Sequence, residues 1–364
     1  MDQSLVLFEE GFFERIWGGT RLRESLGLGA PPDRPIGEAW LVSDHPSHES
    51  RILNGPWRGL TLHQLLERHP DYLLGTLARP TVHGRFPLLL KVLDAADVLS
   101  VQVHPDDEMA RELGEPDVGK TEMWHVLDSQ SGSELICGLD PALDRAGFLA
   151  AAADGSIEAY MRHFPAPPGT TTFVAAGTVH AIGAGILLAE IQQNSDLTYR
   201  IHDWNRVDFQ GRARELHLDK AAMVTAFGSA HGGPAAPLSH GAAPAQVTVL
   251  GACRYFASEL LHLQGTFSRT TNGTSFHIVM PRDGAATLQA GGETHVLQRC
   301  QAALIPAGVG VYKLTGAGFV LDYYVPDLRE DIIAPLRRAG HADRTIAALG
   351  GSPECSDLAA VVCG

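Results

Sequence analysis

The stretch Leu99–Asp107, LSVQVHPDD, decides how this sequence is read, because it alternates like a β-strand and then stops at a proline. Side chains two positions apart point to the same face of a strand. The polar residues Ser100, Gln102 and His104 therefore share one face, and the apolar residues share the other. A half-buried surface strand has the same pattern. A glutamine and a histidine on one face, however, are also two ligands that a single metal ion accepts.

The bulk composition is that of a globular protein with two or three domains. The chain has 364 residues, of which 45% are hydrophobic and 19% charged. Its formal net charge of −14 argues against nucleic acid as the main partner, because phosphate contacts need clustered lysines and arginines. No run approaches the roughly 18 apolar residues of a membrane span, so we expect no membrane partner.

Cysteine usage and the N-terminus predict a cytoplasmic protein. The five cysteines are scattered, odd in number and form no CxxC pair, which disfavours a disulfide framework. The N-terminal sequence MDQSLVLFEEGFFERIW has no basic segment followed by a long apolar run, so we expect no signal peptide.

Frequent glycines and prolines between short apolar runs predict many short strands, and hence a mainly β fold. The expected strands are Pro87–Leu93, Val98–His104, Glu122–Leu127, Glu134–Cys137, Thr171–Val174, Leu187–Gln192, Thr198–His202, Phe256–Leu263, Ser275–Met280, Ala286–Ala290, Glu293–Leu297, Gln301–Ile305 and Phe319–Tyr324. Helical spacing appears at Asp106–Leu113, Arg145–Phe164, Leu216–Ala226 and Asp327–Ala339. Residues 228–246 are small, proline-rich and nearly uncharged, which predicts a linker.

Two segments resemble each other across this linker. Val174–His180, VAAGTVH, and Ile305–Val311, IPAGVGV, both place Ala-Gly at a turn that ends a strand. Three residues after the glycine, the first segment has His180 and the second has Val311. One interpretation is two related β-barrels, of which only the first keeps a ligand; chance similarity is the other.

Four residues that could converge from three strands form a candidate metal site: Gln102, His104, Glu122 and His180. Two imidazoles, a carboxylate and an amide oxygen suit zinc first, with manganese or iron as alternatives. Taken singly, each of these residues also has an ordinary interpretation, as a structural histidine or as a polar residue of a half-buried strand.

Further polar residues interrupt apolar strands or flank them. Glu190 ends the apolar run GILLAE and must be paired, hydrogen-bonded or bound to a metal. Arg200 could hold a phosphate or a developing enolate oxygen, or form a surface ion pair with Asp196. Lys91, in FPLLLKVLDA, is either an edge-strand lysine or a substrate contact.

The motifs LSVQVHPDD, GKTEMWHVLD, AAGTVHAIGAG and EIQQNSDLTYRIHDWNR, together with FERIWGGTRL at Phe13–Leu22, resemble type I mannose-6-phosphate isomerases. The resemblance runs from about residue 5 to 325. It implies a mainly β fold of two cupin-like β-barrels (jelly rolls). The implied domains are a catalytic barrel at 1–227 with a small helical insertion at about 140–165, and a metal-free barrel at 247–325. A tail of unassigned role, 326–364, follows.

The resemblance also implies one Zn²⁺ per chain, held by Gln102, His104, Glu122 and His180. Ser100, Lys120 and Lys91 would line the sugar-phosphate pocket. Arg200, Lys120, Asp196 and Glu190 would be the catalytic residues. The sequence departs from the family at Ala175, where proline is usual, and at His125 and His202, where tyrosine is usual; these neighbours of the motifs could alter the substrate range.

The implied reaction is a metal-dependent aldose–ketose isomerisation between mannose 6-phosphate and fructose 6-phosphate through a cis-enediol. The base stays open between Asp196, Glu190 and water at the ion. The partner would be a small sugar phosphate, and the chain a monomer or weak homodimer. The alternatives are an iron cupin oxygenase and a non-enzymatic sugar-binding or regulatory cupin.

Overall fold

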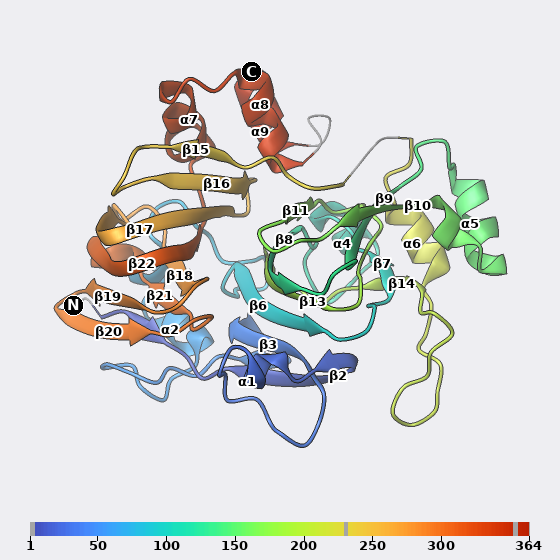
Figure 1. Cartoon of the computed structure of the whole chain (residues 1–364), viewed down its shortest axis with the longest axis horizontal. Helices are drawn as coiled ribbons and strands as arrows, with labels where there is room; N and C mark the ends of the chain where they lie inside the picture. The colour runs from blue at the N-terminus through green and yellow to red at the C-terminus, as the bar shows by residue number, and fades with distance from the viewer. Residues whose placement is uncertain (1–3, 229–231, 352–355, 364) are drawn as a thin grey trace.

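The computed structural model describes residues 4–228, 232–351 and 356–363. Figure 1 shows two β-rich lobes side by side, one built around β6, β8 and β13 and the other around β17 and β22. The prediction of a mainly β chain is confirmed. No helix in the described ranges is long and apolar enough to cross a membrane.

The first lobe pairs a six-stranded sheet with a five-stranded sheet, in the strand orders β11-β8-β13-β6-β2-β3 and β10-β9-β12-β7-β14. The six-stranded sheet contains β2 (Gly11–Gly19), β3 (Ile36–Val42), β6 (Leu88–Ala95), β8 (Glu122–Ser129), β11 (Thr171–Val174) and β13 (Ile186–Gln193). The five-stranded sheet contains β7 (Val101–Val103), β9 (Glu134–Leu139), β10 (Met161–Pro165), β12 (His180–Ile182) and β14 (Tyr199–His202). A short hairpin joins β4 (Asp44–His45) to β5 (His48–Glu49).

The second lobe is a nine-stranded sheet whose longest pair, β17 and β22, runs antiparallel in unbroken register. Its strands are β1 (Val6–Leu7), β15 (Leu238–His240), β16 (Val247–Ala252), β17 (Ala257–Thr270), β18 (His277–Pro281), β19 (Ala286–Ala290), β20 (Glu293–Leu297), β21 (Ala303–Ile305) and β22 (Val311–Tyr324). The segment predicted as a linker therefore contains β15, and its residues 229–231 lie outside the described ranges.

Short helices lie between and around the sheets. The α-helices are α1 (Arg21–Glu24), α2 (Leu62–Arg68), α3 (Pro70–Leu74), α4 (Asp107–Glu112), α5 (Arg145–Asp154), α6 (Leu218–Val224), α7 (Ala334–Arg338), α8 (Asp343–Ala347) and α9 (Asp357–Cys363). Single turns are η1 (Ile157–Tyr160), η2 (Ala307–Val309), the π-helical η3 (Leu328–Ile333) and η4 (Ala348–Gly350). The helices after β22 share a buried apolar cluster with β15 and β16, so residues after 326 pack on the second lobe.

The helix predicted over Arg145–Phe164 is wrong beyond Asp154. Gly155 adopts a left-handed conformation, with φ of +80°, and ends α5 there. The chain then continues as η1 and as β10, an edge strand that pairs with β9.

One apolar core runs through both lobes. β1 leaves the N-terminal part of the chain and pairs with β21, with Val6 opposite Leu304. The rings of Phe86, just before β6, and Phe276, just before β18, lie 4.4 Å apart in the same buried cluster. This core fixes the two lobes against each other and keeps the site described next on a rigid frame.

Candidate active site

Three buried ligand-type side chains converge at the ends of three strands. His104 follows β7, Glu122 begins β8 and His180 begins β12, and their ligand atoms all lie within 4.8 Å of one another. His104 Nε2 is 3.6 Å from Glu122 Oε2, and His180 Nε2 is 3.4 Å from Glu122 Oε1. All three side chains are at most 1% exposed. Pro105 ends β7 directly after His104, which leaves the imidazole at the strand end.

Gln102 completes the group of four residues predicted from the sequence. It lies directly opposite His180 in the β7–β12 pairing, and its side-chain amide is 3.3 Å from His180 Nε2. Because the nitrogen and oxygen of an amide exchange places by a flip, this side chain can present its oxygen at the same point. The alternation of LSVQVHPDD therefore does place Gln102 and His104 together.

The donor set fits a divalent ion such as zinc. Lys120 Nζ lies 2.6 Å from Glu122 Oε2 and pairs with it, whereas no described residue donates a hydrogen bond to Oε1. Burial lowers the pKa of His180 to about 4, and burial with the nearby charge of Lys120 lowers the pKa of His104 well below its usual value. Both imidazoles are thus neutral near pH 7, which is the form that ligates metal. His180 Nδ1 lies 2.8 Å from the Thr178 carbonyl, which leaves Nε2 toward Glu122.

A cavity of about 420 Å³ opens beside these ligands. Seven residues singled out from the sequence line it: Lys91, Ser100, Gln102, Lys120, Glu190, Asp196 and Arg200. His104, Glu122 and His180 are not in its lining but lie directly behind Gln102 and Lys120. His125 and His202, where the sequence departs from the family pattern, do not line it either.

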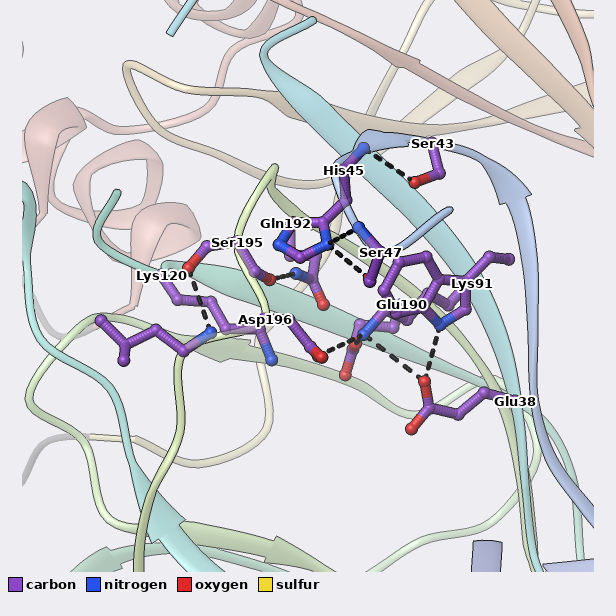
Figure 2. Close-up of polar contacts among 12 residues, drawn as sticks. Glu38, Ser43, His45, Ser47, Lys91, Lys120, Glu190, Gln192, Ser195 and Asp196 are labelled. Carbon is purple, nitrogen blue, oxygen red and sulfur yellow. Dashed lines mark hydrogen bonds and ion pairs between the residues drawn. The ribbon is translucent and has the colours of Figure 1, made fainter. Parts of the chain in front are cut away.

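Lys91 is the centre of a cluster of carboxylates in this cavity. Its Nζ lies 3.6 Å from Glu38, 3.8 Å from Glu190 and 3.7 Å from Asp196, measured to one carboxylate oxygen of each. Figure 2 shows Lys91 beside these three side chains. Because β6 pairs with both β3 and β13, Lys91 faces Trp40 on one neighbour and Glu190 on the other. Lys91 is therefore a buried residue of a central strand and not an edge-strand lysine.

Glu190 and Glu38 have opposite electrostatic environments. Burial and the neighbouring Glu122 raise the pKa of Glu190, whose Oε2 accepts a hydrogen bond of 2.9 Å from Trp124 Nε1. Burial also tends to raise the pKa of Glu38, but the charges of Lys91 and Arg15 outweigh it and hold that pKa at about 2. Glu38 thus stays negatively charged near neutral pH, whereas Glu190 binds a proton more readily than an ordinary carboxylate.

The Arg200 side chain is only partly satisfied. Its Nη1 donates to the Glu215 carbonyl at 3.0 Å, and its buried Nε has no hydrogen-bond partner among the described residues. The alternative of a surface ion pair with Asp196 is wrong, because Asp196 contacts Lys91 instead. Arg214, beside Arg200 in the lining, is bound by Asp203.

The sequence interpretation missed Arg15, Glu38, Arg214 and His217, which also line the cavity. Glu38 carries the same signal that identified Glu190, since it interrupts the apolar run IGEAWLV. Arg214 and His217 lie after β14 in a polar stretch that gives no such signal. Their position depends on how this stretch folds back, with His217 Nδ1 accepting from the Arg200 amide at 3.1 Å.

Comparisons with known proteins agree with this geometry. Residues 5–124 match the family model of the phosphomannose isomerase type I catalytic domain, and residues 246–325 match that of the mannose-6-phosphate isomerase cupin domain. Mannose-6-phosphate isomerase ManA of Bacillus subtilis (strain 168) is 37% identical over 321 residues, which are 87% of this chain and 97% of that protein. The Streptococcus mutans mannose-6-phosphate isomerase is 34% identical over 311 residues, 85% of this chain and 95% of that protein.

Solved structures give the same result at the level of the fold. The crystal structure of the B. subtilis mannose 6-phosphate isomerase superposes with a TM-score of 0.81 at 31% identity, covering 88% of this chain and 99% of that one. A mannose 6-phosphate isomerase bound with zinc and yttrium superposes with a TM-score of 0.68 over 88% of this chain and 99% of that one; at 19% identity this likeness shows the fold alone. The fold is therefore of the cupin type.

Proposed function

This chain belongs to the type I mannose-6-phosphate isomerase family and is an aldose–ketose isomerase acting on mannose 6-phosphate, and from that premise we propose how its cavity performs the reaction. The observation that carries the proposal is a cavity, lined by cations and carboxylates, that lies directly in front of the His104–Glu122–His180 group. The alternatives of an iron oxygenase and of a sugar-binding or regulatory protein are not favoured, because both matching family models and the relatives named above are mannose-6-phosphate isomerases.

Gln102, His104, Glu122 and His180 would hold one Zn²⁺ per chain. The support is a set of two neutral imidazoles, a carboxylate whose Oε1 accepts no hydrogen bond within the described chain, and an amide at the same point. When bound, the ion supplies Lewis-acid polarisation of the substrate oxygens. Lys120, whose Nζ lies 2.6 Å from Glu122 and 3.4 Å from His104 Nε2, would place a positive charge beside the same oxygens.

Ser100, Lys120 and Lys91 would contact the sugar phosphate. A cavity with cations attracts an anionic substrate into a protein whose net charge is −14. Lys91 is largely compensated by Glu38, Glu190 and Asp196, so its main effect would be to orient Glu190 and Asp196. The buried Nε of Arg200 has no hydrogen-bond partner among the described residues, and we assign Arg200 to the charge that develops on the enediolate oxygen.

The proton moves between carbon 2 and carbon 1 through a cis-enediol, and Glu190 is our candidate for the base that carries it. Its raised pKa makes it a stronger base near neutral pH than an ordinary carboxylate. Asp196, whose side chain is 45% exposed, would orient the sugar hydroxyls instead. Both side chains line the cavity, so both can reach a bound substrate.

The remaining expectations form part of the proposal. The two lobes would close as two cupin-like β-barrels, with a catalytic domain at 1–227, a helical insertion at 140–165, a linker at 228–246, a metal-free domain at 247–325 and a tail at 326–364. We propose a monomer or weak homodimer in the cytoplasm, with no nucleic-acid or membrane partner. The acidic net charge supports the absence of a nucleic-acid partner.

The test is proton NMR of mannose 6-phosphate incubated with the zinc-loaded protein in D₂O. Fructose 6-phosphate should form, with deuterium entering at carbon 1 as the enediol exchanges its proton. Glu190→Gln should abolish both conversion and exchange, whereas Asp196→Asn should retain exchange and raise KM. Product without deuterium would exclude a solvent-exchanging enediol. Full activity in Glu190→Gln would exclude Glu190 as the base.

A further inference from the structure

The loop that carries Lys120 is held by a chain of hydrogen bonds that begins in the second lobe. The hairpin between β16 and β17 carries Tyr255, whose hydroxyl donates to Asp107 Oδ2 at 2.8 Å. The other oxygen of the same carboxylate, Oδ1, accepts from the Gly119 amide at 2.9 Å and from Gln193 Nε2 at 3.0 Å. One carboxylate at the start of α4 therefore connects the second lobe to the residue before Lys120.

The loop itself is fixed on both sides of Lys120. The Lys120 amide donates to the Pro105 carbonyl at 2.9 Å, and the Thr121 amide donates to Gln193 Oε1 at 2.9 Å. Gly119 packs directly on the start of α4, since a Cβ there would lie 2.4 Å from Asp107 N. The backbone of this loop is therefore held at several points, and Asp107 is the side chain that connects it to the second lobe through Tyr255.

The position of this loop matters for the Lys120 ammonium group. Lys120 is 4% exposed, and its Nζ lies 2.6 Å from Glu122 and 3.4 Å from His104. A shift of the loop backbone would move this charge relative to both groups. Interactions with a reacting centre are lost steeply with misplacement of this kind.

The residues after 326 brace the hairpin from its other side. Arg254, next to Tyr255, binds Asp357 at the start of α9 through its Nε at 2.9 Å and its amide at 2.8 Å. Tyr255 is therefore held between α9 and α4. Figure 1 shows α9 descending from the top of the molecule toward the junction of the lobes.

We propose that Tyr255 is a positioning residue, which acts through Asp107 on the Lys120 loop, so that the metal-free lobe contributes to the geometry of the catalytic cavity. This inference rests on the role given to Lys120 in the proposed function. Tyr255 belongs neither to the ligand group nor to the cavity lining, so its effect would be on turnover and not on substrate affinity.

The test compares Tyr255→Phe with Tyr323→Phe in the zinc-loaded, full-length protein. Both variants remove one phenolic hydroxyl from the second lobe, but the buried Tyr323 hydroxyl has no hydrogen-bond partner among the described residues. Tyr255→Phe should lower kcat about three- to tenfold, as expected for one lost hydrogen bond to a carboxylate, with KM and zinc content unchanged. Hydrogen–deuterium exchange of the Gly119 and Thr121 amides should rise in Tyr255→Phe alone.

A second pair of variants separates positioning from general destabilisation. In a Lys120→Met background, Tyr255→Phe should cause no further loss of residual turnover, since both changes act on the same side chain. Wild-type turnover and exchange in Tyr255→Phe would overturn the inference. Equal losses in Tyr255→Phe and Tyr323→Phe, or a further loss in the Lys120→Met background, would also overturn it. Full activity in Lys120→Met would instead contradict the proposed function.

Discussion

Each lobe of this molecule contains a buried cluster of charged and histidine side chains, and the two clusters are built in opposite ways. In the first lobe, Glu122 lies between His104 and His180; its Oε2 pairs with Lys120 at 2.6 Å, and its Oε1 accepts no hydrogen bond within the described chain. In the second lobe, Asp322 lies 2.9 Å from His277 Nδ1 and accepts a hydrogen bond of 3.0 Å from Tyr312. The first cluster leaves side-chain atoms available to a bound ligand, whereas in the second cluster these atoms are bonded to one another.

The second cluster is closed by an arginine that the first cluster lacks. Arg269 Nη1 lies 2.5 Å from Glu259 and 3.1 Å from Asp322, and Tyr324 donates to the other Glu259 oxygen at 2.9 Å. Both carboxylates are therefore paired and hydrogen-bonded. The comparison indicates that unpaired acceptor atoms next to a cavity distinguish a binding site from a structural network.

Removing a charge from the closed network should have the largest effect, and this effect should be on stability. Asp322→Asn leaves Arg269 with one carboxylate instead of two and disrupts a fully buried group, so we expect about 3 kcal/mol lower free energy of unfolding. Zinc content and turnover per folded molecule should stay normal. Urea unfolding measures the stability, and parallel assays measure zinc content and turnover. Loss of activity without loss of stability would contradict a purely structural role for the second cluster.

Arg200 in the open cluster should show the reverse behaviour. Arg200→Ala removes the partly satisfied guanidinium from the cavity, and we expect kcat to fall about 100-fold with zinc content and unfolding midpoint retained. Arg337→Ala, which breaks an exposed ion pair with Asp343, is the control and should be neutral. Normal turnover in Arg200→Ala would remove Arg200 from the transition state.

Acid should lower the free energy of unfolding through protonation of Glu38, which lines the cavity. Its pKa falls from 4.5 to about 2 on folding, because Lys91 and Arg15 outweigh the effect of burial. A depressed pKa contributes stability that is present above pH 4.5 and is lost as the pH falls toward 2. Between these values, the zinc-free wild type should lose stability more steeply than Glu38→Gln. Parallel curves from urea unfolding at several pH values would contradict this assignment.

The smallest effect should come from a hydroxyl that belongs to neither cluster. The Tyr323 hydroxyl is buried without a hydrogen-bond partner in the described chain, so Tyr323→Phe removes no interaction. We expect the free energy of unfolding to change by less than about 0.5 kcal/mol, or to rise slightly. A loss well above this value in thermal or urea unfolding would show that the hydroxyl has a partner.

Much of the first lobe could be predicted from local patterns. Alternation placed Gln102 and His104 on one face, and the position of Glu190 inside an apolar run identified a buried carboxylate. The same argument applies to Glu38 in IGEAWLV, because a charge in a fully buried strand needs partners wherever it occurs. These signals are local, because an apolar run and the two-residue period of a strand can both be recognised in a few consecutive residues.

Other features depend on contacts between distant parts of the chain. β1, near the N-terminus, pairs with β21, which is far away in the sequence. No pattern in Val6–Leu7 indicates that partner. β17 extends beyond Leu263 to Thr270 because β22 pairs with it throughout, although Phe267 is the one apolar side chain in that extension. The contact of Tyr255 with Asp107 also joins residues that are far apart in the sequence, so only the folded chain reveals it.

The most direct test of the contrast between the clusters is the zinc content of two histidine variants, measured by mass spectrometry after loading and dialysis. We predict about one zinc per chain in the wild type and in His277→Ala, and none in His104→Ala, with mannose 6-phosphate isomerisation lost only in His104→Ala. Full zinc content in His104→Ala, or loss of zinc in a folded His277→Ala, would contradict this prediction.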